Sequence, residues 1–403
     1  MSTILVLLLL LSIATLASRP AALSGLLDRL LTPLLIMLGI GCAPGGLALL
    51  SSSLVESLEP ALAVGVTWLG ILIGLRSASR EASRQAGRAD QGRASLRAAI
   101  VVVSSTSASV LLAMAALTAP HLLGLRRYDN APLLAGAALI LGGALVGSPP
   151  IDRDNRIELA LRSRLIDVGD LIAVACAIVA LAILPPWSPL PPSMAAVVVV
   201  GSGLLLALVQ RLLGGSANGD PATRTIALLG VVAVGAGLLH DAGLPSAVAG
   251  LVAGATLGYT ELGRVLRAAL APTERPARIV VVFLVGTMMP LSLTSLVVGG
   301  LLAAGQLVVQ FVATSWAVGH RPSARVLATG LSSSSAPLVV AASYALAGLP
   351  EGELLLATAA VAVVTMDVLA AAIGLGTRWQ FPAGALSTPP SAAQSTPPMV
   401  VQR

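Results

Sequence analysis

Three aspartates lie inside long apolar stretches of the sequence, where charged side chains are otherwise rare. Asp167 and Asp170 share one stretch, and Asp367 lies in another. A carboxylate within a bilayer is strongly unfavourable unless it is paired, hydrated or protonated, so it usually faces a polar cavity. Because Asp167 and Asp170 are three residues apart, they occupy neighbouring positions on one helix face. Two carboxylates so close cannot both ionise readily unless a cation joins them, which indicates a site where a proton and a cation compete.

The three acids differ in their expected depth in the membrane. Asp167 lies roughly 4.5 Å along its helix from Arg164 and Asp170 about 9 Å, whereas Asp367 lies roughly 16 Å from Arg378. Asp167 is therefore equally well explained as a first-turn acid that pairs with Arg164 and with the helix N-terminus. That explanation does not suit Asp170 or Asp367.

Two other apolar stretches are interrupted by small residues and proline. The first contains Gly147, Ser148 and Pro149, and the second contains Ser333, Ser334 and Pro337. Discontinuous membrane helices use such residues, because the freed backbone carbonyls and amides can line an ion site. Gly, Ser and Pro are also common in ordinary membrane helices, where small residues serve close packing, and this second interpretation is about as well supported.

The composition requires these stretches to be membrane helices. Of 403 residues, 56% are hydrophobic and 10% are charged, which leaves too little polar surface for a water-soluble globule. A spanning helix needs about 20 apolar residues, so the chain has room for about a dozen helices and for no large soluble domain. The 24 basic residues are all Arg and give a net charge of +6. With four Trp, three Tyr and three Phe, the chain offers no stacking platform for a nucleic acid.

We expect an all-α protein of about thirteen transmembrane helices, because an open sheet edge cannot be satisfied in hydrocarbon. The expected spans are 3–18, 31–50, 61–75, 99–118, 131–148, 165–184, 193–210, 225–240, 244–259, 279–296, 299–318, 325–347 and 354–377. All Arg residues except Arg126 and Arg127 follow odd-numbered spans. Because basic loops stay on the cytoplasmic side, this pattern predicts an inner-membrane protein with its N-terminus outside and its C-terminus in the cytoplasm.

The expected domain organisation is a transmembrane domain over residues 1–378 and a disordered cytoplasmic tail over 379–403, which is rich in Pro, Ser, Thr and Ala. Taking span seven as a linker divides the other spans into two six-helix halves that begin on opposite sides of the membrane. This arrangement indicates an inverted repeat. The interrupted spans five and twelve then correspond, as do the acid-bearing spans six and thirteen. The family resemblance described next implies that the two interrupted helices cross.

Five segments carry a resemblance to a known family, over about residues 20 to 377. They are 34–47, 68–76 (WLGILIGLR), 166–174 (IDVGDLIAV), 239–258 and 283–293 (FLVGTMMPLSL). Together they resemble the monovalent cation/proton antiporters, in particular the bacterial sodium/proton and potassium-efflux branch. The resemblance implies a secondary transporter that exchanges Na⁺ or K⁺ for protons by alternating access. It also implies a moving core of spans four to six and eleven to thirteen, a homodimer formed by the other spans in the lipid bilayer, and no cofactor.

The acidic segment 166–174 resembles the family's motif in two registers, one giving Asp167 and the other Asp170, and depth favours Asp170. The candidate ion-binding residues are Asp170, Asp167, Asp367, Ser148, Ser333 and Ser334, and the candidate helix breaks are Gly147, Pro149 and Pro337.

The sequence departs from the family pattern in three ways. Only 19 residues separate Ser148 from Asp167, fewer than in relatives. The basic residue expected in span eleven is missing, since Gln306 and Gln310 occupy the candidate positions. Asp367 is an additional acid. The short spacing and the missing base favour one alternative, a degenerate membrane subunit or sensor that does not transport, whereas the retained intramembrane acids oppose it.

Other classes of function fit less well. An organic-anion symporter would need a basic group or exposed helix N-termini for the anion, and no Arg is buried in any expected span. His121, His240 and His320 are too far apart in sequence to suggest a metal site, and no nucleophile, base and orienting group cluster as in an enzyme.

Two further motifs concern contacts with lipid and contacts between helices. Arg76 to Arg97 forms a basic stripe suited to anionic lipid. Gly250, Gly254 and Gly258 form overlapping GxxxG motifs that permit close helix approach, within one chain or between two.

Overall fold

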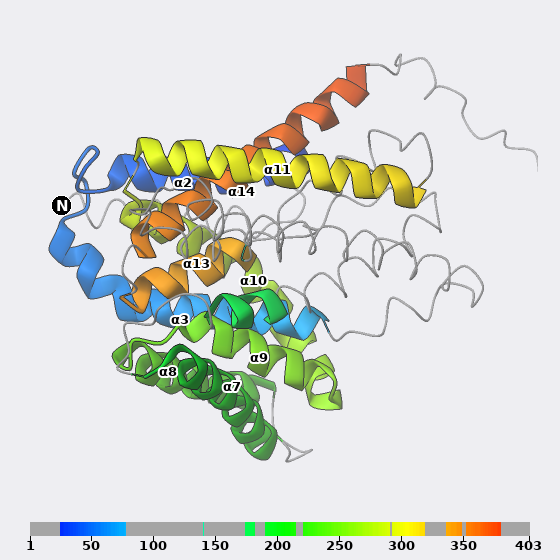
Figure 1. Ribbon diagram of the computed structural model, residues 1–403. Helices are drawn as coiled ribbons and strands as arrows, with labels where there is room; N and C mark the ends of the chain where they lie inside the picture. Colours follow the sequence, from blue (N-terminus) through cyan, green and yellow to red (C-terminus); the bar gives the residue numbers. More distant parts are fainter. Residues whose placement is uncertain are drawn as a thin grey trace, which may run out of the picture.

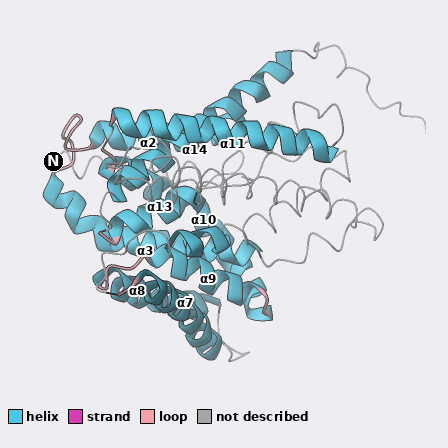
Figure 2. Ribbon diagram, in the orientation of Figure 1, coloured by secondary structure: helices cyan, strands magenta, loops and turns pink. Residues whose placement is uncertain are grey.

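The computed structural model describes residues 25–77, 140, 174–181, 190–214, 221–290, 292–318, 336–348 and 352–379. The described residues contain helices and turns and no strand (Figure 2). The helices are α2 (Gly25–Cys42), α3 (Ser52–Ser77), α7 (Pro192–Gly214), α8 (Pro221–Asp241), α9 (Ser246–Gly258), α10 (Glu261–Met288), α11 (Leu293–Val318), α13 (Ala336–Leu346) and α14 (Gly352–Trp379) (Figure 1). Residues 174–181, in the second half of expected span six, are also helical.

These helices agree in order with the expected spans two, three and seven to thirteen. By length and apolar composition alone, three of them could cross a membrane, over Ser52–Leu75, Pro192–Leu213 and Gly352–Leu369. Expected spans one and four, and nearly all of span five, lie outside the described residues. The expected count of thirteen therefore stays a prediction.

One boundary differs because the chain turns early. Span two was expected to continue to residue 50, but α2 ends at Cys42. The Leu47 amide donates to the Gly41 carbonyl at 2.8 Å, and Ala48 adopts a positive φ of 51°. The pair Gly45 and Gly46 follows a proline and allows the chain to reverse there before α3 begins.

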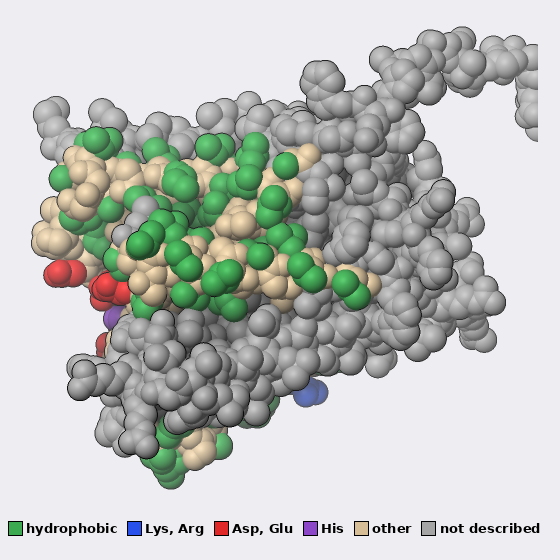
Figure 3. Space-filling view, turned by 45° about the horizontal axis from the view of Figure 1, so that its top comes forward, with side chains coloured by type: hydrophobic (Ala, Val, Ile, Leu, Met, Phe, Trp, Pro, Cys, Tyr) green, Lys and Arg blue, Asp and Glu red, His purple; other side chains and the backbone are tan. Residues whose placement is uncertain are grey.

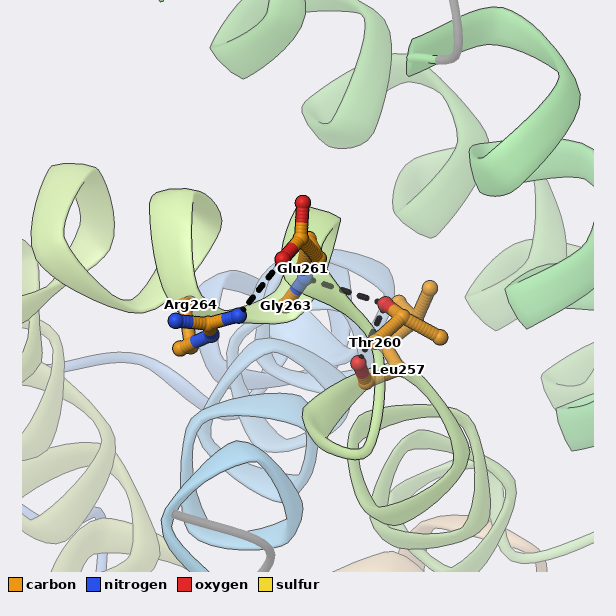
Figure 4. A network of polar contacts seen from close by, with 5 residues as sticks. All are labelled: Leu257, Thr260, Glu261, Gly263 and Arg264. Carbon is orange, nitrogen blue, oxygen red and sulfur yellow. Dashed lines mark hydrogen bonds and ion pairs between the residues drawn. The ribbon is translucent and has the colours of Figure 1, made fainter. Parts of the chain in front are cut away.

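A second boundary differs at α10, which begins at Glu261, well before the expected start at residue 279. Thr260 caps it: the Thr260 hydroxyl accepts the Gly263 amide at 3.1 Å and donates to the Leu257 carbonyl of α9 at 2.6 Å (Figure 4). The Arg264 guanidinium pairs with Glu261 at 2.8 Å across the first turn. Pro272 and Pro276 lie within the helix without ending it.

Helices α3 and α9 pack closely at glycine residues that lie on both helices. A Cβ at Gly70 of α3 would lie 2.5 Å from the Ala247 carbonyl oxygen of α9. A Cβ at Gly250 or Gly254 would meet the Thr67 or Ile71 carbonyl of α3. The GxxxG motif at 250 and 254 therefore serves packing within the chain, by letting two backbones touch.

Four more helices belong to the same assembly, and glycines mark two of their contacts. At the crossing of α2 and α10, a Cβ at Gly286 would lie 2.7 Å from the Ile36 carbonyl oxygen. On α7, a Cβ at Gly203 would lie 2.6 Å from the Ala249 carbonyl oxygen of α9. Helix α8 packs on α7 and α3. We call α2, α3, α7, α8, α9 and α10 the scaffold group.

The remaining helices form a second set around α14, which we call the core group: α11, α13, α14 and the helical residues 174–181. A Cβ at Gly299 of α11 would lie 2.7 Å from the Thr358 carbonyl oxygen of α14. Helix α13 packs on α14 and also contacts α3, α9 and α10, while α14 contacts α2. Among the described glycines, each backbone-to-backbone approach between helices joins members of the same group.

The two ends of the helix assembly differ in charge. Short connections join α2 to α3, α8 to α9 and α10 to α11. These three junctions lie at the same end of the helix assembly (Figure 1). Described acids at that end are Glu56, Glu59, Asp241 and Glu353, beside His240. The opposite end carries Arg211, Arg264 and Arg267. Figure 3 shows acidic side chains and a histidine at one end of the visible face and a basic side chain towards the other.

Candidate ion-binding site

Most residues of the expected ion site lie outside the described part of the chain. They are Asp167, Asp170, Gly147, Ser148, Pro149, Ser333 and Ser334. The structure does describe Asp367 and Pro337, together with the helical residues 174–181 that follow the two acids of span six. The structure therefore describes residues that border the expected site, but not most of the site itself.

Asp367 lies on the buried side of α14. Its residue is 7% exposed, whereas the next residues, Val368 and Leu369, are exposed. An acid at this position has left bulk water, and a buried carboxylate in a membrane helix is rare unless it has a purpose. Asp367 therefore has the burial expected of an ion-binding acid.

Pro337 is the second residue of α13, whose eleven residues are buried almost throughout. Ser333 and Ser334, where the break is expected, lie outside the described residues.

Helix α11 packs on α14 through one narrow stripe of its surface. Ser295, Gly299, Ala303 and Gln306 recur every three or four residues and are buried, while Leu296, Leu301 and Val308 are exposed. Gln306 is 2% exposed, so a polar amide occupies this interior position. Gln306 is one of the two positions, with Gln310, at which the resemblance leads us to expect a base, and its side chain is buried.

Tyr344 joins span twelve to span six, a contact that the sequence analysis did not identify. The Tyr344 hydroxyl on α13 donates to the Ala177 carbonyl at 3.1 Å, and the Tyr344 residue is 0% exposed. A tyrosine inside an apolar stretch needs a hydrogen-bond partner, which was a usable signal. The partner could not be deduced, because the two residues are far apart in sequence.

The longer α10 also changes the local setting of two arginines. Because α10 begins at Glu261, Arg275 and Arg278 lie within a helix, and both are half-buried. Both precede the expected span, which begins at residue 279, so they lie in the part of α10 that the sequence analysis placed before the span.

Several hydroxyl groups in the described helices are already used by the helix backbone. Thr67 donates to the Ala63 carbonyl at 2.7 Å, Ser343 to Val340 at 2.8 Å and Thr365 to Val361 at 2.7 Å. Such bonds satisfy the hydroxyl within its own helix. Among the described residues, no three His, Cys, Asp or Glu side chains are grouped as metal ligands. Asp367 on α14 and Gln306 on α11 are buried polar side chains, and each has an interaction of its own within the structure.

Comparison with known proteins gives a match in structure. No family model and no curated protein matches the sequence. Among solved structures, the chain is similar to the sodium proton antiporter MjNhaP1 from Methanocaldococcus jannaschii, with a TM-score of 0.54 and 17% sequence identity. The similarity covers 94% of this chain and 97% of the antiporter chain. At this identity the likeness identifies the fold: the chain is an all-α, multi-pass membrane protein with the fold of a sodium proton antiporter.

Proposed function

We propose that this protein is a secondary transporter that exchanges a monovalent cation, Na⁺ or K⁺, for protons by alternating access. The observation that carries the proposal is the burial of Asp367 in a membrane helix of an antiporter-like fold. A buried acid can hold either a proton or a cation, and exchange follows when the acid is exposed to each side in turn.

The proposed ion site combines acids from the two halves of the inverted repeat. Asp170 is the carrier, with Asp167 beside it and Asp367 contributed by α14. Ser148, Ser333 and Ser334 supply oxygen ligands at the breaks of spans five and twelve, which Gly147, Pro149 and Pro337 create. With Gln306 in place of a base, no fixed positive charge on α11 competes with the cation for the carboxylates.

The proposed movement is a displacement of the core group against the scaffold group. Backbone-to-backbone glycine contacts hold each group together, as at Gly70 and Gly250 in the scaffold and at Gly299 in the core. Helices α13 and α14 contact α3 and α2, but no described glycine brings two backbones together across this boundary. Interfaces formed by side chains can slide more readily than interlocked backbones, which supports a boundary between these groups.

The proposal includes the setting of the protein in the cell. We place it in the inner membrane with the acidic end outside and the arginine-rich end in the cytoplasm, in agreement with the loop charges. Exposed apolar side chains on α7, such as Val197, Leu205 and Leu212, face lipid or the second subunit of a homodimer.

Proton flux in proteoliposomes tests the proposal. The purified protein should move protons when Na⁺ or K⁺ is added, and a comparison of the two ions identifies the substrate. Asp170→Asn and Asp367→Asn should each abolish this flux, because the neutral amide cannot exchange a proton for a cation. Glu353→Gln is the matched control, since Glu353 is an exposed acid at the start of the same helix as Asp367. Full flux in Asp170→Asn would remove Asp170 from the site.

A second candidate function is a membrane subunit or sensor that keeps the fold without transport. The missing base in span eleven and the short Ser148–Asp167 spacing favour it. In that case the wild-type protein, folded and reconstituted, would move no protons with either cation.

A further inference from the structure

We propose that the outward face of the corner between α9 and α10 binds an anionic phospholipid. Arg264 and Arg267 hold the headgroup phosphate, and Tyr259 and Val265 lie against the glycerol and the upper acyl chains. The inference goes beyond the proposed transport function and does not depend on it.

The first half of α10 has one buried face and one exposed face. Gly263, Leu266 and Leu270 recur every three or four residues and are buried, so they share the side that packs on the rest of the chain. The Trp68 indole N–H of α3 donates to the Thr273 hydroxyl at 3.2 Å. This attachment to α3 fixes which side of the helix points outward.

The outward face of the corner combines apolar and basic side chains. Tyr259 is 61% exposed and Val265 is 47% exposed. The Arg264 side chain is 53% exposed, and Arg267 is half-buried. Tyrosine suits a membrane interface because its ring enters the apolar layer while its hydroxyl stays hydrated. An arginine likewise lays its apolar stem along hydrocarbon and keeps its guanidinium among the headgroups.

The charges at the corner leave one arginine without a partner. Arg264 pairs with Glu261 at 2.8 Å, so these two charges cancel (Figure 4). Within the described part of the chain, the Arg267 guanidinium makes no ion pair and no hydrogen bond. A guanidinium can donate two parallel hydrogen bonds to a phosphate. The corner therefore complements an anionic headgroup better than a zwitterionic one, which brings a cation of its own.

The apolar side chains at the corner favour a lipid over a dissolved anion. Helix α7 packs on α9 and exposes Leu208 and Leu212 near the end that carries Arg211. The apolar outer surface of the molecule therefore continues to this end. A dissolved phosphate would occupy the arginines alone and leave Val265 in water, whereas a phospholipid covers both kinds of side chain.

Local fluorescence quenching tests the proposal with the full chain in bilayers. A fluorophore on Val265→Cys detects lipid at the corner. The same fluorophore on Leu205→Cys of α7, a residue that is 59% exposed, detects lipid at an ordinary apolar surface. Cys42 and Cys176 are buried, so labelling should be confined to the introduced cysteine. The bilayers contain phosphatidylcholine and phosphatidylglycerol, and either lipid in turn carries brominated acyl chains that quench the fluorophore.

We expect the probe at residue 265 to report a preference of about fivefold for phosphatidylglycerol, the factor that one arginine near an anionic headgroup represents. Arg267→Gln should remove most of this preference. Glu261→Gln should increase it, because Arg264 is then released from its partner. The probe at residue 205 should report no preference. Equal quenching by the two lipids at residue 265 would overturn the proposal.

Competition distinguishes a lipid from a dissolved anion. Inorganic phosphate should reduce the preference no more than chloride does at the same ionic strength. If phosphate removes the preference where chloride does not, the arginines bind a free anion and the proposal is wrong. If Arg267→Gln does not fold, Glu261→Gln decides the matter, because the Glu261 side chain is 93% exposed and its replacement is mild. An unchanged preference in folded Glu261→Gln would then overturn the role of the arginines.

Discussion

Gln210 on α7 is a buried amide whose hydrogen-bonding groups are unsatisfied. It is 1% exposed, and neither its Oε1 nor its Nε2 atom has a hydrogen-bond partner within the described residues. Such a group loses its hydrogen bonds to water on burial and gains no hydrogen bond within the protein. We therefore expect Gln210→Met to stabilise the folded protein by about 1 kcal/mol, seen as a higher melting temperature in detergent.

The matched control for this change is Gln306→Met. Gln306 is as deeply buried as Gln210, but it takes part in a polar interaction. The same substitution should lower the melting temperature there. Equal effects at the two positions would show that the unsatisfied amide of Gln210 is not the source of the gain.

Residue chemistry was predictable from the sequence where it depended on residue type and local surroundings. Asp367 stands out because it interrupts an apolar stretch, and the structure describes it as buried. The partner of Tyr344 was not predictable, because Ala177 contributes a backbone carbonyl that any residue would provide. A hydrogen bond to a backbone carbonyl leaves no trace in the type of the residue that accepts it.

At the level of elements, the close contact between α3 and α9 should not tolerate a larger residue. Gly254→Ala would drive its Cβ into the Ile71 carbonyl, and rigid backbone cannot move aside. We expect a loss of about 1–3 kcal/mol, measured as a lower melting temperature. Gly230→Ala on α8 is the control, because a Cβ there meets nothing within 4 Å. It should leave the melting temperature unchanged or slightly higher, and a similar loss at both positions would contradict the packing argument.

The corner between α9 and α10 allows a second prediction at this scale. Thr260 caps α10 and also donates to the Leu257 carbonyl. Thr260→Ala should therefore destabilise the protein by about 1 kcal/mol, the usual effect of losing an N-cap. Thr260→Ser keeps the hydroxyl and should retain most of the wild-type melting temperature. A loss of equal size in both variants would assign the effect to the methyl group.

The elements themselves were predictable to different degrees. Apolar length indicated the order of the helices, since a membrane span leaves a strong signal in composition. The start of α10 was not anticipated, because its first half is amphipathic and contains Pro272 and Pro276. The cap at Thr260, followed by Glu261, was a local start signal that hydropathy alone overlooks.

For the whole molecule, the charge difference between its ends predicts its orientation. Glu56→Cys should react with an impermeant thiol reagent in intact cells, whereas Arg264→Cys should react only after lysis. Both positions are exposed, and the native Cys42 and Cys176 are buried, so background labelling should be low. Labelling of Arg264→Cys from outside would reverse the proposed orientation.

The length of α10 has a consequence for the surrounding lipid. Its 28 residues extend about 42 Å, compared with a hydrocarbon thickness of about 30 Å. An isolated helix would absorb the difference by tilting, but α10 is in backbone contact with α2 at Gly286 and cannot tilt alone. Because the first half of α10 is amphipathic, the excess length lies among the lipid headgroups and holds this end of the helix at the membrane surface. Acyl-chain length should consequently be a variable in any reconstitution of this protein.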